Sequence, residues 1–288
     1  MISVIICSRS AETRQLVAGN IAATIGVPYE IITIDNSTNR YGICAAYNEG
    51  ARRSKYDLLC FAHEDIEFQT RNWGEIISDI FQDETIGVLG VAGGTQQVDA
   101  PAGWAGGGKD SVFMNVMHDI KGEKEPTLDW NNPSDARLID VACVDGVWIC
   151  ARRAVWEQVR FDEQAFPGFH FYDVDFCTRA FRLCRICVTF DVLIKHFSRG
   201  SFNDVWYATA LQYYRKRRAY LPFGTLPAPA EVVATLSLNT LRQFTSDYID
   251  RRISYADSLF LVWESVSRSR FKRESWWLAR KLAQSLIK

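Results

Sequence analysis

The sequence has little net charge, no long apolar run and no internal repeat. Its 288 residues carry a formal net charge of −1. Nucleic-acid-binding proteins normally carry clustered basic charge, so we expect no nucleic-acid partner. No apolar stretch approaches the roughly 18 residues of a membrane-spanning helix. The opening residues, "MISVIIC", lack the basic segment and the long apolar core of a signal peptide. We therefore expect a cytoplasmic protein.

The sequence also lacks a pattern of paired cysteines. Its eight cysteines lie mostly in apolar stretches, which predicts reduced, buried thiols and not a disulfide framework. Cys184 and Cys187 form a CxxC pair, but no second pair stands at the spacing of a zinc ribbon. We therefore expect no metal or redox role for this pair.

Two glycine-rich segments fall short of nucleotide-binding motifs. "GVLGVAG", at residues 87–93, has the spacing GxxGxxG where a dinucleotide site has GxGxxG, and no helix start follows it. "GGGKDS", at residues 106–111, lacks the GxxxxGK[ST] frame of a P-loop. Neither segment predicts binding of NAD or ATP.

What is present is an alternation of strand and helix patterns along the first third of the chain. Short apolar runs rich in β-branched residues predict strands, and apolar residues at helical spacing predict helices. Their alternation implies a mostly parallel, doubly wound sheet with right-handed crossovers and helices on its faces. The predicted strands are residues 2–7, 30–34, 58–62 and 86–92, and the predicted helices are residues 12–23, 43–53 and 73–81.

A long connection interrupts this alternation. Residues 93–135 are rich in Gly, Pro, Asp and Lys, and a connection of this length inside a compact domain is usually functional or mobile. Strand and helix patterns then return. The predicted strands are residues 138–144, 147–151 and 186–192, and a helix is predicted for residues 173–184.

The chain is expected to end in a helical extension. "PFGTLPAPAE", at residues 222–231, contains three prolines and is typical of a linker. Beyond it the pattern is helical throughout. We therefore predict an α/β domain over residues 1–225 and a C-terminal helical extension over residues 226–288.

Polar side chains follow three of the predicted strands. In a parallel sheet, ligands bind at the carboxyl ends of the strands. His63 and Asp65 would face the same side of an extended segment, with Glu64 opposite. An imidazole and a carboxylate that converge suit a divalent cation with open positions for phosphate oxygens, although a surface loop with helix-capping acids fits the triplet equally well. The residues at these ends are Ser8 and Arg9, Asp35 and Asn36, and His63, Glu64 and Asp65.

The segment "GICAAYNEGARRSKYDLLCFAHED", residues 42–65, resembles the inverting family 2 glycosyltransferases with the GT-A fold. In that family a turn that is usually Asp-x-Asp binds Mn²⁺ or Mg²⁺ on the diphosphate of a nucleotide sugar. His63 stands at the first acidic position, which leaves Asp65 as the best-supported ligand. Histidine favours Mn²⁺ over Mg²⁺, because imidazole suits transition metals. The substitution also leaves a weak or absent metal as an alternative.

Other segments resemble the same family in the same order, up to about residue 215. "FYDVDFCTR" is similar to the element that carries the catalytic base, which implies this role for Asp173. "IKHFSRGSF" is similar to a late segment that closes over the diphosphate, which implies a metal or phosphate role for His196. "SVIICSRS" and "IITIDNST" are similar to the two opening strands. The resemblance implies contacts with the nucleotide sugar from Ser8, Arg9, Asp35, Asn36, Asn48 and Glu64.

Structural roles are the alternatives at several of these positions. Asp173 stands where a helix is predicted to begin and could be its N-cap. Asp35 could cap the second helix in the same way, and His196 could be a structural histidine. His118 and His170 have no partner pattern and are expected to be structural.

The last segment, residues 268–288, predicts a basic amphipathic helix. Such a helix can lie on the anionic inner face of a membrane. It more often packs its apolar stripe on its own domain or on a second subunit, in a homo-oligomer. The side chains at helical spacing are Trp276, Ala279, Leu282, Ala283 and Leu286.

The resemblance implies transfer of a sugar, with inversion, from a nucleotide-diphosphate sugar to a hydroxyl of a glycan or lipid-linked glycan, as in polysaccharide biosynthesis. The alternative is an inactive protein of the same fold that binds a nucleotide sugar or a carbohydrate, and His63 in place of Asp supports it. A third hypothesis is a nucleotidyltransferase. Such enzymes need a glycine-rich loop after the first strand, and "CSRSAETR" has no glycine there.

Overall fold

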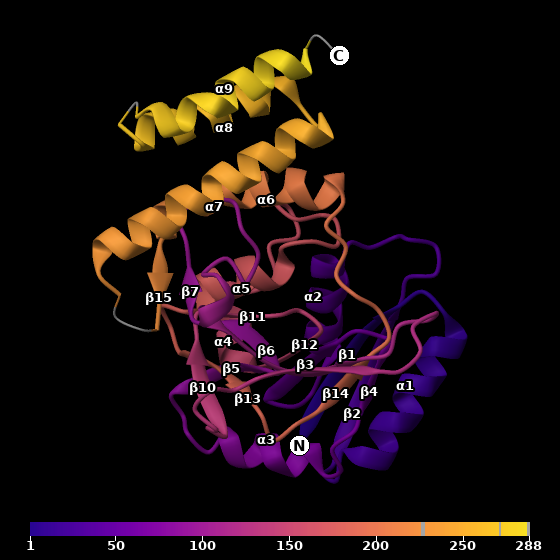
Figure 1. The fold of residues 1–288 in the computed structure, drawn as a ribbon. Coiled ribbons are helices and arrows are strands. Elements are labelled where there is room, and N and C mark those ends of the chain that lie inside the picture. The colour runs from indigo at the N-terminus through magenta and orange to yellow at the C-terminus, as the bar shows by residue number, and fades with distance from the viewer. Residues whose placement is uncertain (226–227, 271, 287–288) are drawn as a thin grey trace.

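The computed structural model describes residues 1–225, 228–270 and 272–286, and a seven-stranded sheet forms its centre (Figure 1). The strands of this sheet are β1 (Ile2–Ser8), β2 (Tyr29–Asp35), β3 (Leu58–Ala62), β5 (Ile86–Gly90), β10 (Leu138–Val141), β12 (Trp148–Arg152) and β13 (Arg185–Thr189). They lie in the order β10-β13-β5-β12-β3-β1-β2. β10 and β12 run antiparallel to their neighbours, and the other adjacent pairs are parallel. The predicted α/β fold with a mostly parallel sheet is confirmed.

Helices cover both faces of this sheet. Alternate residues of a strand face opposite sides, and β1 shows the result. Ile5 packs in one core cluster with Tyr47 of the second helix, while Val4 packs in another with Val17 and Ile77 of the first and third helices. The helices are α1 (Ala11–Thr24), α2 (Ile43–Arg53), α3 (Trp73–Ile80), α4 (Arg153–Val159), α5 (Tyr172–Ala180), α6 (Asp204–Arg217), α7 (Ala230–Arg251), α8 (Tyr255–Arg268) and α9 (Arg273–Ser285), with 3₁₀ turns η1 (Lys109–Ser111) and η2 (Arg218–Tyr220).

The close packing of α2 on β1 depends on Gly50. A Cβ atom on this residue would lie 2.3 Å from Cγ2 of Ile5, far inside van der Waals contact. Glycine at this position therefore sets the depth at which α2 lies on the sheet.

A second sheet adds the strands that complete the site. Its strands are β4 (Ile66–Phe68), β6 (Ala92–Gly94), β8 (Val112–His118), β9 (Thr127–Asn131), β11 (Cys143–Val144) and β14 (Ile194–His196). They lie in the order β11-β6-β8-β14-β4, with β9 paired to β8. A third pair consists of β7 (Gln96–Gln97) and β15 (Phe223–Gly224).

Three of these strands, β7, β8 and β9, lie wholly where a long connection was predicted. The prediction of a connection without strands is therefore wrong for these residues, and β8 and β9 are the two longer strands among them. β9 is half-exposed or exposed along its whole length and therefore lacks an apolar pattern. In β8 the apolar sequence pattern is interrupted by Asn115. The buried amide of this residue donates to the carbonyl oxygens of Phe190 and Val192, 3.0 Å from each. The predicted strand 138–144 is also divided, because β10 and β11 belong to different sheets.

The expectation of eight reduced thiols fails at one pair. Cys60 and Cys150 stand directly opposite each other on the antiparallel strands β3 and β12 and form a disulfide, with their Cα atoms 4.2 Å apart. Separate apolar runs in a sequence do not reveal which residues face each other across strands. The other six cysteines are free, including Cys184 and Cys187 of the CxxC pair.

The C-terminal helices pack on the α/β domain. Figure 1 shows α7, α8 and α9 stacked at one end of the molecule, next to α6. Leu241 and Tyr248 of α7 and Leu261 of α8 belong to the core cluster that contains Ile5 of the central sheet. The extension thus shares one continuous core with the domain. Residues 226 and 227, at the predicted boundary, lie outside the described part of the chain.

The last helix packs mainly on its neighbours α7 and α8. Leu278 and Leu282 of α9 are buried against Ile249 of α7 and Val262 of α8. Only part of the predicted stripe is covered, because Trp276, Ala283 and Leu286 remain exposed. Residues 271, 287 and 288 of the predicted amphipathic segment lie outside the described residues. In the described part of the chain, no helix combines the length and apolar character needed to cross a membrane.

Candidate active site

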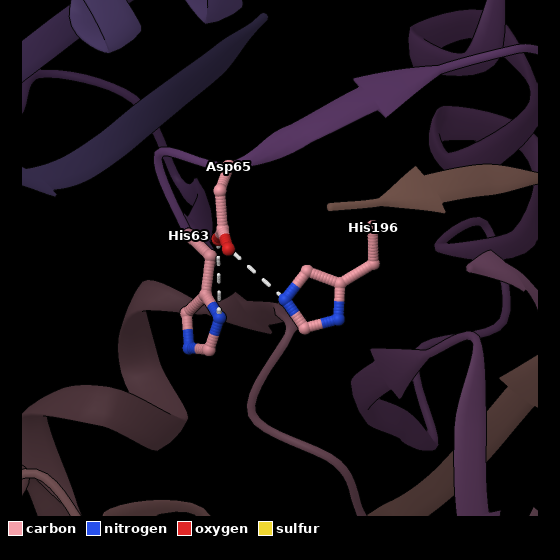
Figure 2. Close-up of side chains that lie close together, drawn as sticks. All are labelled: His63, Asp65 and His196. Carbon is pink, nitrogen blue, oxygen red and sulfur yellow. Dashed lines mark ion pairs between the residues drawn. The ribbon is translucent and has the colours of Figure 1, made fainter. Parts of the chain in front are cut away.

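Three side chains from distant parts of the sequence meet at the carboxyl end of β3. His63 follows β3, Asp65 precedes β4, and the pairing of β14 with β4 places His196 opposite Ile66. Nε2 of His196 lies 3.5 Å from Oδ1 of Asp65, and Nδ1 of His63 lies 3.9 Å from the same oxygen (Figure 2). One ligand atom from each of the three lies within 4.8 Å of the others. We call this group the His-Asp-His cluster.

The hydrogen bonds around His63 determine which of its ring nitrogens carries the proton. Nε2 lies 2.7 Å from the hydroxyl of Tyr172, and this hydroxyl donates to the carbonyl oxygen of Gly146 over 2.8 Å. Because the single hydroxyl proton goes to the carbonyl, Nε2 must be the donor to Tyr172. Nδ1 is then left with a free lone pair on the side of Asp65, the tautomer that a metal ligand requires.

Electrostatics favour the same protonation states. Burial raises the pKa of the Asp65 carboxyl, but the hydrogen bond and charge of His196 and the charge of His63 outweigh it and hold that pKa well below its usual range. Burial lowers the pKa of His63, against the raising effect of Asp65. Near neutral pH the carboxylate is therefore ionised and the imidazole neutral. These are the forms that bind metals, and two imidazoles with a carboxylate suit Mn²⁺.

Asp173 lies on the first turn of α5 but does not cap it. The N-cap position belongs to Phe171, in a left-handed conformation with φ of 66°. Oδ2 of Asp173 accepts a hydrogen bond from the backbone N–H of Gly146 at 3.0 Å, and Oδ1 accepts one from that of Val174 at 2.9 Å. Burial and the charge of Asp145 raise the pKa of Asp173 to about 7. A carboxyl with this pKa can take up and release a proton at neutral pH.

The neighbouring acid, Asp175, has a different role. It is fully buried and forms ion pairs with Arg179 and Arg217. The pair with Arg179 lies within α5, and the pair with Arg217 joins α5 to α6, so Asp175 stabilises the fold. As the sequence predicts, Asp173 and Asp175 do not face the same side of the helix.

Sequence reasoning missed Asp145. This residue follows β11, it lines the same cavity as Asp173, and its Oδ1 accepts from the N–H of Val147 at 2.8 Å. The sequence analysis considered polar residues only after the first three predicted strands. The same search after the strand predicted for residues 138–144, which contains β11, would have found Asp145. Gly146, which follows, is close to Tyr172, because a Cβ atom there would lie 2.1 Å from the Tyr172 hydroxyl.

A cavity of about 650 Å³ connects these groups. His63, His196, Asp145 and Asp173 line one part of it. Side chains of α6 and α7 line another part, so the helical extension contributes to the site. His118 and His170 also line the cavity. His118 lies 3.0 Å from Asp129 on the adjacent strand β9, measured from Nδ1 to Oδ2.

Glu64 points away from the cluster and ties β1 to β3. Its carboxylate accepts from the hydroxyl of Ser8 at 2.7 Å and from the backbone N–H groups of Arg9 and Ser10 at 3.1 and 3.4 Å. The three residues predicted to bind the nucleotide sugar here thus form one unit at the carboxyl edge of the sheet. None of them lines the cavity that contains Asp173.

Asp35 and Asn36 differ in how accessible they are. Asp35 keeps 65% of its side chain exposed, and the hydrogen bond from the backbone of Ser37 lowers its pKa. It does not cap the second helix, whose N-cap is Gly42. Asn36 is buried, and its amide exchanges two hydrogen bonds with the backbone of Tyr41. Asp35 is therefore available to a ligand, while Asn36 shapes the loop.

The structure places Asn48 in a buried hydrogen-bond network, whereas the resemblance implied a contact with the nucleotide sugar. Its side chain is buried; Nδ2 donates to the carbonyl oxygen of Phe161 and to Glu163, and Oδ1 accepts from the N–H groups of Phe161 and Trp156. All four hydrogen-bonding positions of the amide are used. Asn48 thus joins α2 to α4 and to the segment that follows α4.

Comparisons with known proteins identify the family of this chain. Residues 3–219 match the model of a family described as a glycosyltransferase-like family, and the chain belongs to that family. Its fold is the GT-A fold of glycosyltransferases, as the sequence predicts.

A curated relative matches part of the chain. A stretch of 137 residues is 26% identical to the streptomycin biosynthesis protein StrF of Streptomyces griseus, and it covers 46% of this chain and 43% of that protein. The matched stretch is thus less than half the length of this relative.

A solved structure shows the likeness of fold, and a second match is weaker. The mannosyltransferase PcManGT from Pyrobaculum calidifontis, solved with GDP-Man and Mn²⁺, aligns over 100% of this chain and 86% of its own with a TM-score of 0.53 and 13% identity. GalNAc-T7, solved with UDP, GalNAc and Mn²⁺, aligns over 86% of this chain and 54% of its own with a TM-score of 0.49 and 11% identity.

Proposed function

We propose that this protein is an inverting, divalent-metal-dependent glycosyltransferase that moves a sugar from a nucleotide-diphosphate sugar to an acceptor hydroxyl of a glycan or lipid-linked glycan. The observation that carries this proposal is that His63 and His196 of the His-Asp-His cluster line the same cavity as Asp173. The His-Asp-His cluster provides metal ligands, and Asp173 provides a carboxyl with a pKa of about 7.

His63, Asp65 and His196 are the residues that would hold the metal. Their ligand atoms are close enough together, and the tautomer of His63 leaves a lone pair on the correct side. We favour Mn²⁺ over Mg²⁺, because two of the three ligands are imidazoles. When bound, such an ion neutralises the negative charge that develops on a departing diphosphate.

Asp173 acts as the general base in this proposal. Its carboxylate accepts the proton of the acceptor hydroxyl while the oxygen attacks the anomeric carbon of the donor sugar. The new carbon–oxygen bond forms as the bond to the diphosphate breaks, and the electron pair of that bond leaves with the diphosphate. Attack from the opposite face inverts the anomeric centre. The N–H groups of Gly146 and Val174 hold the carboxylate in place.

The nucleotide is proposed to bind at the edge of the sheet beside the cluster. Asp35 is exposed there, and Ser8 lies opposite Asp35 in the pairing of β1 with β2. Glu64 orders the backbone of Arg9 at the same edge. PcManGT, which shares the fold, was solved with a nucleotide sugar and Mn²⁺, and this supports the proposal.

A binding protein without catalysis is the second candidate. One observation favours it: His63 stands where the glycosyltransferase family that the sequence resembles usually has an acid. Such a protein would bind the donor but release no sugar to an acceptor or to water. Release of nucleotide from the bound donor therefore separates the two candidates.

Calorimetric titration of UDP, GDP and dTDP, each with and without Mn²⁺, tests the proposal on wild type and Asp65→Ala. We expect one nucleotide to bind in a manganese-dependent way and the variant to lose this binding. Asp250→Ala is the matched control, because this acid is exposed on α7 and outside the cavity. Binding that ignored both Mn²⁺ and Asp65 would remove the metal from the proposal, and absence of any binding would overturn it.

A further inference from the structure

The cavity extends from His63 and His196 to an aromatic wall formed by side chains of α6, of α7 and of the loop before α6. Phe202, Trp206, Tyr207 and Phe244 form this wall, and all four line the cavity. The ring centroids of Trp206 and Tyr207 lie 5.1 Å apart, and those of Tyr207 and Phe244 lie 5.2 Å apart. Phe202 packs edge-on against Trp206 at 5.0 Å and remains 62% exposed. The wall is therefore a preformed set of rings that is partly open to solvent.

A carboxylate and an amide stand beside the aromatic wall. Oδ1 of Asp247 accepts from Nε2 of Gln243 at 2.9 Å, one helical turn earlier on α7, and Oδ2 accepts from the hydroxyl of Tyr207 at 3.3 Å. Both residues line the cavity. The guanidinium of Arg251 lies 4.5 Å from the ring of Tyr207 and bonds to Asp204 at 2.9 Å. These contacts hold the wall and the carboxylate in fixed relative positions.

Aromatic rings beside a fixed carboxylate suit a sugar ring. The C–H groups of one face of a sugar are attracted to the negative face of an aromatic ring, and its hydroxyls can donate to a carboxylate and an amide oxygen. A lipid chain cannot form hydrogen bonds with a carboxylate or an amide, and burying a carboxylate against it would be unfavourable. The chemistry of this wall therefore favours a carbohydrate over a lipid chain.

We propose that the aromatic wall, Asp247 and Gln243 form an acceptor subsite that binds a carbohydrate. The proposal rests on the proposed function, because the same cavity holds Asp173, toward which the bound acceptor would present a hydroxyl. Gln243, Phe244 and Asp247 lie beyond the residues 3–219 that match the family, so the match does not supply this subsite. The C-terminal helices would then determine which acceptor is used.

Saturation-transfer NMR on the full chain with nucleotide and Mn²⁺ tests the subsite. The probes are the methyl glycosides of glucose, galactose, mannose and N-acetylglucosamine, with dodecyl phosphate as the lipid probe. We expect saturation of the ring protons of at least one glycoside. Asp247→Ala should weaken this binding about tenfold or more, because a hydrogen bond to a charged group is lost. Gln243→Ala, an exposed position at which folding is not at risk, should weaken it as well.

Asp250→Ala is the matched control, since it removes an acid from the same helix outside the cavity. It should bind the glycoside like wild type, and all three variants should keep manganese-dependent nucleotide binding. Tyr207→Phe keeps the ring but removes its bond to Asp247, and it should retain most of the binding if the carboxylate itself contacts the sugar.

Two outcomes would overturn the subsite while leaving the proposed function intact. One is binding of dodecyl phosphate with no glycoside bound. The other is glycoside binding that Asp247→Ala and Gln243→Ala leave unchanged. Failure of wild type to bind any nucleotide in the presence of Mn²⁺ would instead overturn the proposed function, and the subsite proposal with it.

Discussion

Nε2 of His63 lies 2.7 Å from the hydroxyl oxygen of Tyr172, and that hydroxyl in turn donates to the backbone of Gly146. The orientation of the imidazole is therefore fixed by the main chain through a tyrosine on α5. Partners of this kind, behind the ligands themselves, set the tautomer and basicity of a metal-binding histidine. Tyr172 is a positioning residue in this site.

Tyr172→Phe removes that hydroxyl while keeping the ring. His63 then has no partner for its Nε2 proton, and the preference for a free Nδ1 lone pair is lost. We expect the affinity for Mn²⁺ to fall about 10- to 100-fold, measured by electron paramagnetic resonance of free Mn²⁺ during titration. Tyr213→Phe is the control, because it removes an equally buried hydroxyl that bonds to Thr178. Equal effects of the two changes would contradict the role of Tyr172.

Asp173→Asn should remove most of the transfer activity and spare donor binding. The amide cannot accept the hydroxyl proton, so turnover should fall by about 10²- to 10⁴-fold. In wild type, activity should rise as pH increases through about 7, because the ionised form of Asp173 is the base. Nucleotide release across pH 5.5 to 8.5, scanned in roughly half-unit steps, measures both effects. A variant that kept the wild-type rate and pH profile would exclude Asp173 as the base.

The carboxyl of Asp173 should lower the stability of the fold as pH rises, whereas it raises activity. Its pKa is about 7 in the folded protein and about 3.9 in an unfolded chain. The folded state therefore holds the proton more tightly, so this contribution to stability is complete below about pH 4 and is lost as pH rises through 7. Asp173→Asn should lose less stability than wild type between pH 5 and pH 8 in urea unfolding. Parallel losses in both proteins would contradict the raised pKa.

Asn48→Ala should reduce stability without affecting the site. The change leaves the groups of Phe161 and Trp156 without their partner in a buried position, which typically costs roughly 2–4 kcal/mol. We expect a lower free energy of unfolding in urea, with manganese-dependent nucleotide binding unchanged in the protein that remains folded. Loss of nucleotide affinity at full stability would restore the role that the sequence predicted.

The central sheet and most of the cluster follow from local sequence patterns. Runs such as residues 2–7 are apolar on both faces because helices cover both sides of the sheet, and this signal is strong. His63 and Asp65 were predictable because the carboxyl end of a parallel strand is where ligands bind. The second sheet was not predictable in the same way, because β9 is an exposed edge and β8 contains a buried asparagine.

Other parts depend on contacts between distant segments. Asn48 sits in a motif that resembles a binding element, yet its partners come from residues 156–163, more than a hundred positions later. The disulfide between Cys60 and Cys150 depends on the register of β3 against β12. The tautomer of His63 depends on Tyr172 and Gly146 together. None of these pairings leaves a periodic signal in the sequence.

The part of the cavity that α7 lines has a consequence for how the acceptor of such a protein can change in evolution. The groups proposed for chemistry lie within residues 63–196, whereas Gln243, Phe244 and Asp247 lie on a helix that follows them in the chain. Substitutions on α7 can therefore change the shape and polarity of one side of the cavity without moving the His-Asp-His cluster or Asp173. A lineage could exchange one acceptor for another by altering a single helix while its donor chemistry is inherited unchanged.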